Sequence, residues 1–368
     1  MDQSIEYRKQ GKAMRLVVST DAGAGWADWT ARLQGTIYHS VAWAEAQRSE
    51  TRSPLYFSWV DDHGFCNGVA IGIKRWSPIR YIGRYSKRLD FESYPAVQGG
   101  GDLINTLIKE LVDYARQEGY RSVAVNSYYA GAFIPDLRDA GLLAHPRIEF
   151  LIDLTQSDDE LWKGLSAHHQ RKIKKADRQG LVFEVSTDVD AMRYFRELQT
   201  VSRNRKKQPG EYVVMPEESC YAEMGNSYLR NDLGRVFLMT HEGRVVSAAL
   251  ISLYRGRALY VLGGTSEEGF AREAPVLLFW KAMSRCRELG CRELNLGGVP
   301  AGASNPGAPS HGLYRFKSNF GGRQAPCISG SAEDLSSVRG LVASGIHRVR
   351  SSAQRLFSPG DVSQHYQG

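Results

Sequence analysis

The chain has 368 residues, of which 42% are hydrophobic and 24% are charged. This composition is that of an ordinary globular protein of roughly two domains, and it excludes a membrane-spanning chain because no run of about eighteen apolar residues occurs. The net charge of +7 at pH 7 favours an anionic partner, such as nucleic acid, a nucleotide-linked substrate or an anionic lipid surface. The five cysteines have no CxxC spacing, and the polar N-terminus lacks the apolar stretch of a signal peptide. We therefore expect a cytoplasmic protein with reduced thiols.

Short apolar runs and turn signals predict a strand-rich beginning of the chain. Strands are expected around 16–18 and 55–60, with a helix near 38–49 between them. The turn signal at 61–64 leads into another apolar run at 68–73. The two runs on either side of this turn form a predicted hairpin.

A glycine triplet, Gly99–Gly101, precedes a helix whose apolar residues share one face. Asp102 is the predicted N-cap of this helix and Gly119 is its predicted end. Glycines before a helix suit a phosphate-binding turn, but the carboxylate of Asp102 would occupy the anion-binding end, so a plain turn is the simpler interpretation. Residues 121–126 are then predicted as a strand.

The second half of the chain repeats this order of elements. Helices are predicted at 188–205, 217–230 and between Pro275 and Gly290, and strands at 235–240, 245–253, 258–262 and 293–296. A hairpin, a strand, a helix and a strand therefore occur twice, about 170 residues apart. The repeat predicts two similar mixed α/β domains with a boundary near 145–155; a chance likeness in order is the alternative.

The segment Gly312–Gly322 places one lysine, Lys317, among aromatic and apolar side chains. A buried lysine needs a partner. Lys317 is therefore predicted either to face an anion, such as a phosphate or the oxyanion of an acyl transfer, or to be the exposed lysine of a C-terminal strand. The preceding stretch 299–310 is rich in Gly, Ala, Pro and Ser, which predicts a mobile surface loop that would suit a lid.

Basic residues gather in three clusters, at 163–178, at 193–207 and in the C-terminal tail at 339–355. Each cluster is either a solvated helix face or part of a polyanion-binding surface. The tail also has apolar residues at helical spacing. This spacing predicts either a basic amphipathic helix on an anionic membrane face or a C-terminal helix packed on the body of the protein.

Four motifs in this order resemble FemAB-like proteins of the GNAT (acetyltransferase) superfamily, over roughly residues 35–325. They are Tyr38–Trp43, Leu161–Leu165 followed by Arg171–Ala176 and Gly180, Ala274–Leu278, and Tyr314–Gly322. The resemblance implies a mixed α/β fold of two tandem GNAT-like domains, at 1–150 and 151–330, and a basic amphipathic or flexible tail at 331–368. The best-known branch of such proteins transfers an amino acid from aminoacyl-tRNA to the peptide stem of a peptidoglycan precursor. Another branch, labelled as acetyltransferases, occurs in exopolysaccharide and cell-envelope systems.

The resemblance also implies site residues. The pair Phe316 and Lys317 matches a Phe-Lys pair of the family motif, in which the lysine stabilises the oxyanion of the tetrahedral intermediate or contacts the terminal ribose and phosphate of the donor. The candidates for substrate binding are Arg171, Lys172, Tyr260, Tyr314 and Arg315. For the tyrosines the alternative is an ordinary core position, and for the basic residues it is a solvated helix face. The general base is either Glu273, Asp153 or a phosphate of the substrate.

The junction Gly263–Pro275 bears on the donor. An ordinary GNAT acetyltransferase holds the pyrophosphate of acyl-CoA on backbone amides after the pattern Gln/Arg-x-x-Gly-x-Gly/Ala. Here that spacing fails, three glutamates would repel a pyrophosphate, and Pro275 lacks an amide hydrogen. The pattern argues against acyl-CoA in the second domain. The interrupted segment 188–230 shows no sign of the long helical arm of some peptidoglycan-bridge enzymes, so the donor stays open between aminoacyl-tRNA and acyl-CoA.

Three functions follow as hypotheses. The first is a FemAB-type acyltransferase that acts on a cell-wall or envelope glycan precursor at the inner face of the cytoplasmic membrane, with tRNA as a possible partner. The second is an acyl-CoA-dependent N- or O-acetyltransferase of exopolysaccharide biosynthesis. The third is a non-catalytic module that binds a nucleotide-sugar or RNA. No metal site is expected, because the adjacent His168 and His169 cannot face one ion from a helix.

Overall fold

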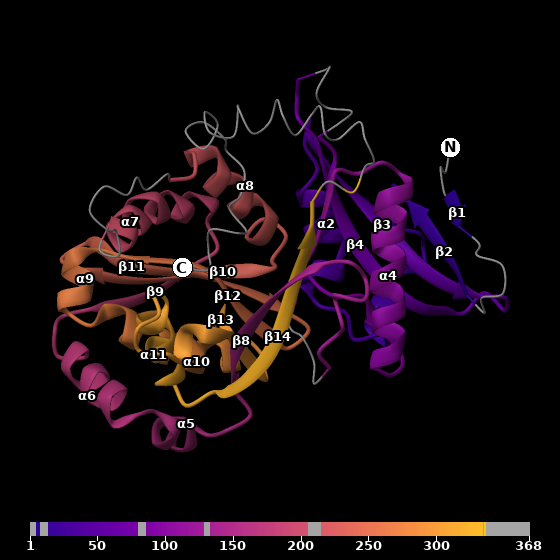
Figure 1. Cartoon of the computed structure of the whole chain (residues 1–368). Helices are drawn as coiled ribbons and strands as arrows, with labels where there is room; N and C mark the ends of the chain where they lie inside the picture. The colour runs from indigo at the N-terminus through magenta and orange to yellow at the C-terminus, as the bar shows by residue number, and fades with distance from the viewer. Residues whose placement is uncertain are drawn as a thin grey trace. The chain divides into compact units, whose positions relative to one another are not determined.

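A computed structural model of the chain describes residues 5–7, 14–79, 86–128, 133–204, 215–333 and 335 (Figure 1). The chain divides into two compact units. Within the described residues, the first unit contains those up to Arg147 together with those from Pro326, and the second contains Ile148–Ala325. Each unit has its own set of strands, its own core and its own covering helices.

The sheet of the first unit has the strand order β1-β2-β3-β4-β5-β7-β14, and the short strand β6 pairs with β4. The strands are β1 (Ile5–Tyr7), β2 (Met14–Ser19), β3 (Arg52–Asp61), β4 (Cys66–Arg75), β5 (Arg88–Phe91), β6 (Ala96–Val97), β7 (Ser122–Val125) and β14 (Arg323–Ala332, from Pro326 in this unit). The helices are α1 (Trp26–Arg32), the 3₁₀ helix η1 (Ile37–His39), α2 (Val41–Ala46) and α4 (Gly101–Gln117). β5 and β7 run parallel because α4 forms the crossover between them.

Helices cover both faces of this sheet. On one face lies α4 (Figure 1), whose residues Leu107 and Leu111 are fully buried in a core that also contains Phe57 of β3. The neighbouring residue on β3, Tyr56, points to the other face, where its ring meets the edge of Trp26 from α1. This alternation of side chains along β3 allows one strand to serve two cores.

The sheet of the second unit has the strand order β8-β13-β12-β11-β10-β9. The strands are β8 (Leu143–Asp153, from Ile148 in this unit), β9 (Val182–Ser186), β10 (Gly234–His241), β11 (Arg244–Tyr254), β12 (Arg257–Thr265) and β13 (Glu293–Pro300). The helices are α5 (Asp158–Gly164), α6 (Ala167–Ala176), η2 (Val189–Met192), α7 (Arg193–Asn204), α8 (Glu218–Tyr228), α9 (Glu267–Ala271), α10 (Ala274–Glu288), η3 (Ala301–Ser304) and α11 (His311–Ser318). β12 and β13 are parallel, with α10 between them in the chain.

This second sheet is also covered on both faces, by α7 and α8 on one and by α5, α6, α10 and α11 on the other (Figure 1). The latter four helices share one apolar core, to which α6 contributes Ile173 and α10 contributes Leu277 and Met283. The core residues of α10 include the consecutive run Val276–Phe279 as well as Ala282, Met283 and Cys286, so this helix is buried on more than one side.

The two units repeat the predicted order of elements. A hairpin, a strand, a helix and a strand are formed by β3, β4, β5, α4 and β7 in the first unit, and by β10, β11, β12, α10 and β13 in the second. The predicted mixed α/β fold with two similar units is confirmed. The first residues of the tail predicted at 331–368 are the end of β14, and residues 336–368 with their basic cluster lie outside the described residues, as do the basic residues 205–207. In the part of the chain that is described, no helix is long and apolar enough to cross a bilayer.

Two predictions about the C-terminal region were wrong. The segment that contains Lys317 is the helix α11 followed by a turn, not a strand. Leu313, Phe316 and Phe320 pack on the core at intervals of three and four residues, which is helical spacing. The stretch 299–310 is not an open loop throughout, because it begins in β13, continues as η3 and buries Ala303 in the core.

The start of α4 also differs from the prediction. Gly100 is the N-cap, and no side chain caps this end. Asp102 lies in the first turn instead, one residue beyond the beginning of the helix. Its carboxylate there still interacts favourably with the positive end of the helix dipole.

Candidate functional site

The parallel strands β12 and β13 separate after a short paired stretch. They pair only where Arg257–Leu259 meets Glu293–Asn295, although both strands continue further. Where they part, β12 contains a bulge at Val261, since Ile251 of β11 pairs with Tyr260 and Leu250 with Leu262. Peptide groups that lose a strand partner inside a protein must find other hydrogen bonds.

On β12 those bonds come from α7. The side-chain amide of Gln199 donates to the carbonyl oxygen of Gly263 over 3.2 Å. The hydroxyl of Ser202 accepts from the amide of Thr265 over 3.0 Å and donates to its carbonyl oxygen over 3.1 Å. α7 approaches so closely that a Cβ on Gly264 would lie 2.7 Å from the Cβ of Leu198. α7 thus replaces β13 along this edge of β12.

On β13 the bonds come from two buried polar side chains, Asn295 and Lys317. The amide of Gly297 donates to the side-chain oxygen of Asn295 over 2.7 Å, and the carbonyl oxygen of Gly298 accepts from Nζ of Lys317 over 3.0 Å. Lys317 is only 5% exposed. Its Nζ lies 5.9 Å from the centre of the Tyr260 ring, at the distance of a cation–π contact. The predicted lysine therefore lies where the two strands part.

The side chain of Phe316 packs among other rings, away from the Gly298 carbonyl and the Tyr260 ring that contact Lys317. Its ring lies within 5.2 to 5.8 Å of the rings of Phe320, Phe279 and His169. Its carbonyl oxygen accepts from Nε2 of His169 over 3.1 Å. Burial lowers the pKa of His169 to about 4, so this imidazole is neutral and donates from Nε2. Phe316 fixes α11 to α6 and α10, and thereby holds Lys317 from the next position in the chain.

The two predicted tyrosines lie in different surroundings. Tyr260 is beside Lys317, and its hydroxyl occupies the space that a Cβ on Gly263 would take. Burial raises the pKa of Tyr260. Tyr314 instead meets the edge of Phe150 and accepts from the side-chain amide of Gln324 over 3.1 Å. The geometry associates Tyr260 with the lysine and gives Tyr314 a packing role.

Three predicted basic residues come together on the surface of the second unit. Arg171 and Lys172 lie on α6 and Arg315 lies on α11. Some loss of hydration and then the charges of Lys172, Arg171 and Arg315 lower the pKa of His168, while the charge of Glu273 raises it, so all three cations act on one imidazole. This set of four residues is called the α6–α11 basic patch below.

Carboxylate side chains and their ion-pair partners occupy the junction between α9 and α10. The hydroxyl of Ser266 accepts from the amide of Gly269, which uses up one donor of this turn. Glu273 is the N-cap residue of α10, and its carboxylate lies 2.8 Å from Nζ of Lys172. Glu268 is paired with Arg272 over 3.0 Å. Each of these two carboxylates is paired with a cation of the protein, and the repulsion of a pyrophosphate at this junction stays a prediction.

The candidates for the general base have other partners. Asp153 accepts from the amide and the hydroxyl of Thr155 within its own turn, and hydrogen bonds to Thr155 lower its pKa. A buried carboxylate that the sequence analysis missed is Glu149 of β8, which accepts from the side-chain amide of Asn295 over 2.9 Å. The sequence did contain a sign that these two polar residues are buried. Glu149 and Asn295 each stand between two apolar residues, in an apolar run and in a predicted strand respectively.

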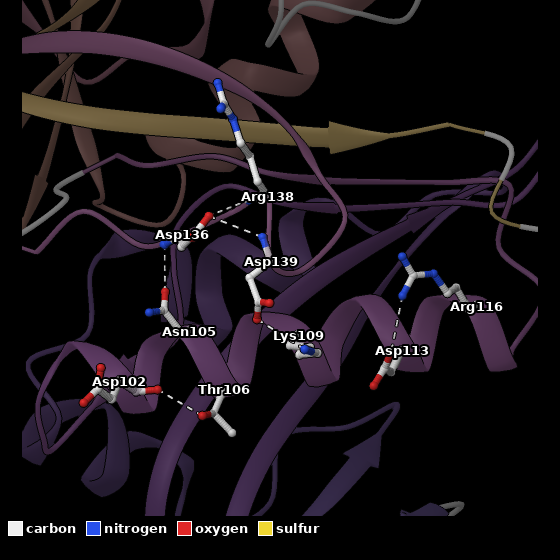
Figure 2. Close-up of polar contacts among 9 residues, drawn as sticks. All are labelled: Asp102, Asn105, Thr106, Lys109, Asp113, Arg116, Asp136, Arg138 and Asp139. Carbon is white, nitrogen blue, oxygen red and sulfur yellow. Dashed lines mark hydrogen bonds and ion pairs between the residues drawn. The ribbon is translucent and has the colours of Figure 1, made fainter.

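The glycine triplet of the first unit has a packing role. A Cβ on Gly101 would overlap the ring of Phe133. The residues after Phe133 lie against α4, as Figure 2 shows for Asp136 and Asp139. The side-chain oxygen of Asn105 accepts from the amide of Asp136, and Lys109 is paired with Asp139. This end of α4 is therefore occupied by the protein's own residues. Among the residues that the structure describes, no group of three or more potential ligands is placed to hold a metal ion.

Comparisons with known proteins bear on the fold of the chain and on a domain within the second unit. Residues 165–318 match the acetyltransferase (GNAT) domain family. The crystal structure of FemX matches 86% of this chain and 95% of its own, with 15% identity and a TM-score of 0.63. Weaker matches are L-PGS from Bacillus licheniformis (91% and 98% covered, 15% identity, TM-score 0.49) and a tandem GNAT protein from the clavulanic acid biosynthesis pathway (78% and 85% covered, 13% identity, TM-score 0.46). No curated protein matches the chain.

The family match runs from Leu165 in the α5–α6 turn to the end of α11, and so includes β12, β13 and Lys317. The resemblance to FemAB-like proteins of the GNAT superfamily is confirmed at the level of the fold and of this domain. Together, the family match and the fold support an acyltransferase.

Proposed function

Because the chain carries a GNAT acetyltransferase domain in the fold of FemX, we propose that it is a FemAB-type acyltransferase. In this proposal it moves an aminoacyl group from a charged tRNA to an amine or hydroxyl of a cell-wall or envelope glycan precursor. The observation that carries the proposal is the buried ammonium of Lys317 at the point where β12 and β13 part.

Lys317 suits the chemistry of acyl transfer. The acceptor's nitrogen or oxygen attacks the ester carbonyl carbon and gives up a proton, and the ester oxygen of the donor leaves with a proton. Between these events the carbonyl oxygen carries a full negative charge. A fixed cation in a water-poor site is worth far more against that charge than in water, and losing one such donor costs about 3–4 kcal/mol elsewhere. The Tyr260 ring beside Nζ helps to hold the cation.

The surroundings of this lysine favour tRNA over acyl-CoA as the donor. The Glu273–Lys172 pair lies at the helix end that would otherwise receive a pyrophosphate. The α6–α11 basic patch supports contact with a phosphate backbone, and the net charge of +7 supports approach to an anionic membrane face.

The test is a transfer assay with the purified full chain, a labelled aminoacyl-tRNA and a nucleotide-linked peptidoglycan precursor. We expect label in the precursor with the wild-type chain and a loss of on the order of 100-fold or more with Lys317→Met. Wild-type turnover by Lys317→Met would refute the assignment of the lysine. Salt-dependent tRNA binding without any transfer would instead favour the non-catalytic alternative.

The second candidate is an acyl-CoA-dependent acetyltransferase of exopolysaccharide biosynthesis. The observation that favours it is the match to an acetyltransferase domain family. Calorimetry with acetyl-CoA separates the two, since a closed α9–α10 junction predicts no measurable heat. Acetyl-CoA binding together with acetyl transfer to a sugar acceptor would replace the first proposal by the second.

A further inference from the structure

A pair of buried polar side chains, Glu149 and Asn295, lies beside the point where β12 and β13 part. Both are 0% exposed. The side-chain amide of Asn295 donates to Oε2 of Glu149 over 2.9 Å, and its side-chain oxygen accepts from the amide of Gly297 over 2.7 Å. Because a buried polar group costs free energy unless it is hydrogen-bonded, this arrangement leaves Asn295 one stable orientation.

The bond to Gly297 holds a bend in β13. Gly297 has φ of +74°, a left-handed conformation that interrupts an extended strand. Its amide has left the ladder with β12, which ends at Asn295. Without the Asn295 oxygen this amide would be buried and unsatisfied, and the bend would lose the contact that maintains it.

The bend in turn places the acceptor for Lys317. Gly298 follows the bend directly, and its carbonyl oxygen accepts from Nζ of Lys317 over 3.0 Å. Three hydrogen bonds therefore connect Glu149 to Asn295, Asn295 to the bend, and the bend to the ammonium. The side chain of Glu149 lies more than 160 residues from the lysine in the chain and yet is connected to it through Asn295 and two backbone groups.

We propose that Glu149 and Asn295 are positioning residues that fix the ammonium of Lys317 through the Gly297–Gly298 bend. The inference rests on the proposed function, in which Lys317 stabilises the oxyanion. A misplacement of about 1 Å in a catalytic group costs up to about 100-fold in rate. The effect falls on kcat with little change in KM, since the α6–α11 basic patch is untouched.

The test uses a charge swap within the pair. Asn295→Asp places a second carboxylate against Glu149 and removes the donor that joins them, and we expect kcat to fall about 10- to 100-fold. Glu149→Gln keeps an oxygen that accepts from Asn295, so we expect a loss of only a few-fold. In the double variant Glu149→Gln/Asn295→Asp the new amide donates to the new carboxylate. We expect it to recover most of the kcat that Asn295→Asp loses.

A second readout does not depend on turnover. The rate at which Lys317 reacts with an amine reagent, followed by peptide mass spectrometry, reports how firmly Nζ is held. We expect slow labelling in the wild type, faster labelling in Asn295→Asp and slow labelling again in the double variant. If Asn295→Asp does not fold, Asn295→Ala removes the hydrogen bonds to Glu149 and Gly297 without adding a charge. The kcat and the labelling rate are then measured on Asn295→Ala.

The outcomes separate this inference from the proposed function. If Lys317→Met abolishes transfer while the Asn295 variants keep wild-type kcat and wild-type labelling, the positioning role is refuted and the proposed function stands. If Lys317→Met transfers at the wild-type rate, the proposed role of the lysine fails, whatever the Asn295 variants do. A loss of kcat that the double variant does not recover would also overturn the pairing of Glu149 with Asn295.

Discussion

The carboxylate of Glu273 lies 2.8 Å from the ammonium of Lys172, at the N-terminal end of α10. Glu273 holds this position in a left-handed conformation, with φ of 58°, which costs free energy for a residue other than glycine. The ion pair occupies the helix end that would otherwise be open to an anion. It also holds one cation of the α6–α11 basic patch. In the proposed function, the phosphates of the tRNA donor would therefore compete with Glu273 for Lys172.

The first prediction concerns this competition. We expect Glu273→Gln to tighten tRNA binding by about 2- to 5-fold, because the amide no longer competes for Lys172. We expect Lys172→Met to weaken binding and to reduce the salt slope by about one phosphate contact. Fluorescence anisotropy with labelled tRNA between about 50 and about 200 mM salt measures both effects.

The matched control is Lys109→Met in the first unit. Lys109 is also a helix lysine paired with one carboxylate, that of Asp139 (Figure 2). It lies outside the α6–α11 basic patch, so the variant should leave the salt slope unchanged. An equal loss of affinity in Lys109→Met and Lys172→Met would show that only net charge matters.

The second prediction separates the chemical role of Lys317 from its structural one. Lys317→Met keeps the aliphatic length but leaves the carbonyl oxygen of Gly298 without this donor. A buried unsatisfied group costs about 1–3 kcal/mol, so we expect a lower urea midpoint as well as a kcat reduced by on the order of 100-fold or more. Lys281→Met, a half-exposed lysine on α10, should keep both values. A drop in stability without a drop in the kcat of the folded protein would assign Lys317 to structure alone.

The third prediction concerns the contact between two of the family motifs. Gly321 has φ of +79°, and a Cβ there would overlap the carbonyl oxygen of Gly164. We expect Gly321→Ala to destabilise the protein by about 2–4 kcal/mol, because both the backbone strain and the overlap must be relieved. Gly243 has nearly the same φ, +76°, but nothing within 4 Å of its added Cβ.

Gly243→Ala is therefore the control, and it should cost only the strain of about 1 kcal/mol. Urea unfolding followed by circular dichroism measures both variants. Equal losses in the two variants would mean that the Gly164–Gly321 contact contributes nothing beyond the backbone conformation.

The fourth prediction follows from two buried histidines. Burial lowers the pKa of His39 and of His169 from 6.5 to about 4 each, so both are neutral in the folded protein. The unfolded chain takes up these protons at a higher pH than the folded chain does. The contribution of these histidines to the free energy of unfolding is therefore fully present above about pH 6.5. It is lost as the pH decreases toward about 4, by about 3 kcal/mol for each histidine.

Urea unfolding at a series of pH values between about 4 and about 7 measures this slope. His169→Gln should remove its share of the slope. A slope that is the same in the wild type and in His169→Gln would contradict the prediction.

Several elements could be predicted because their signals are local. Spacing or turn residues within one short window predict three of them: the hairpin around Asp61–Gly64, the amphipathic α4 and the helix that begins at Ala274–Pro275. The helix α11 was missed because alternating and helical patterns both fit its few apolar residues. Only the packing of Phe316 and Phe320 against α10 separates the two.

By itself, the sequence determined the order of elements, the repeat of that order in two units and the basic character of α6. These are properties of neighbouring residues, and the spacing of apolar side chains reports them directly. Only the tertiary structure decided what Lys317 bonds to, that Arg315 joins Arg171 and Lys172 near His168, and that Glu149 accepts a hydrogen bond from Asn295. Such partners are set by where two strands lose their pairing and which side chains then satisfy the exposed peptide groups, and no pattern along the chain encodes that choice locally.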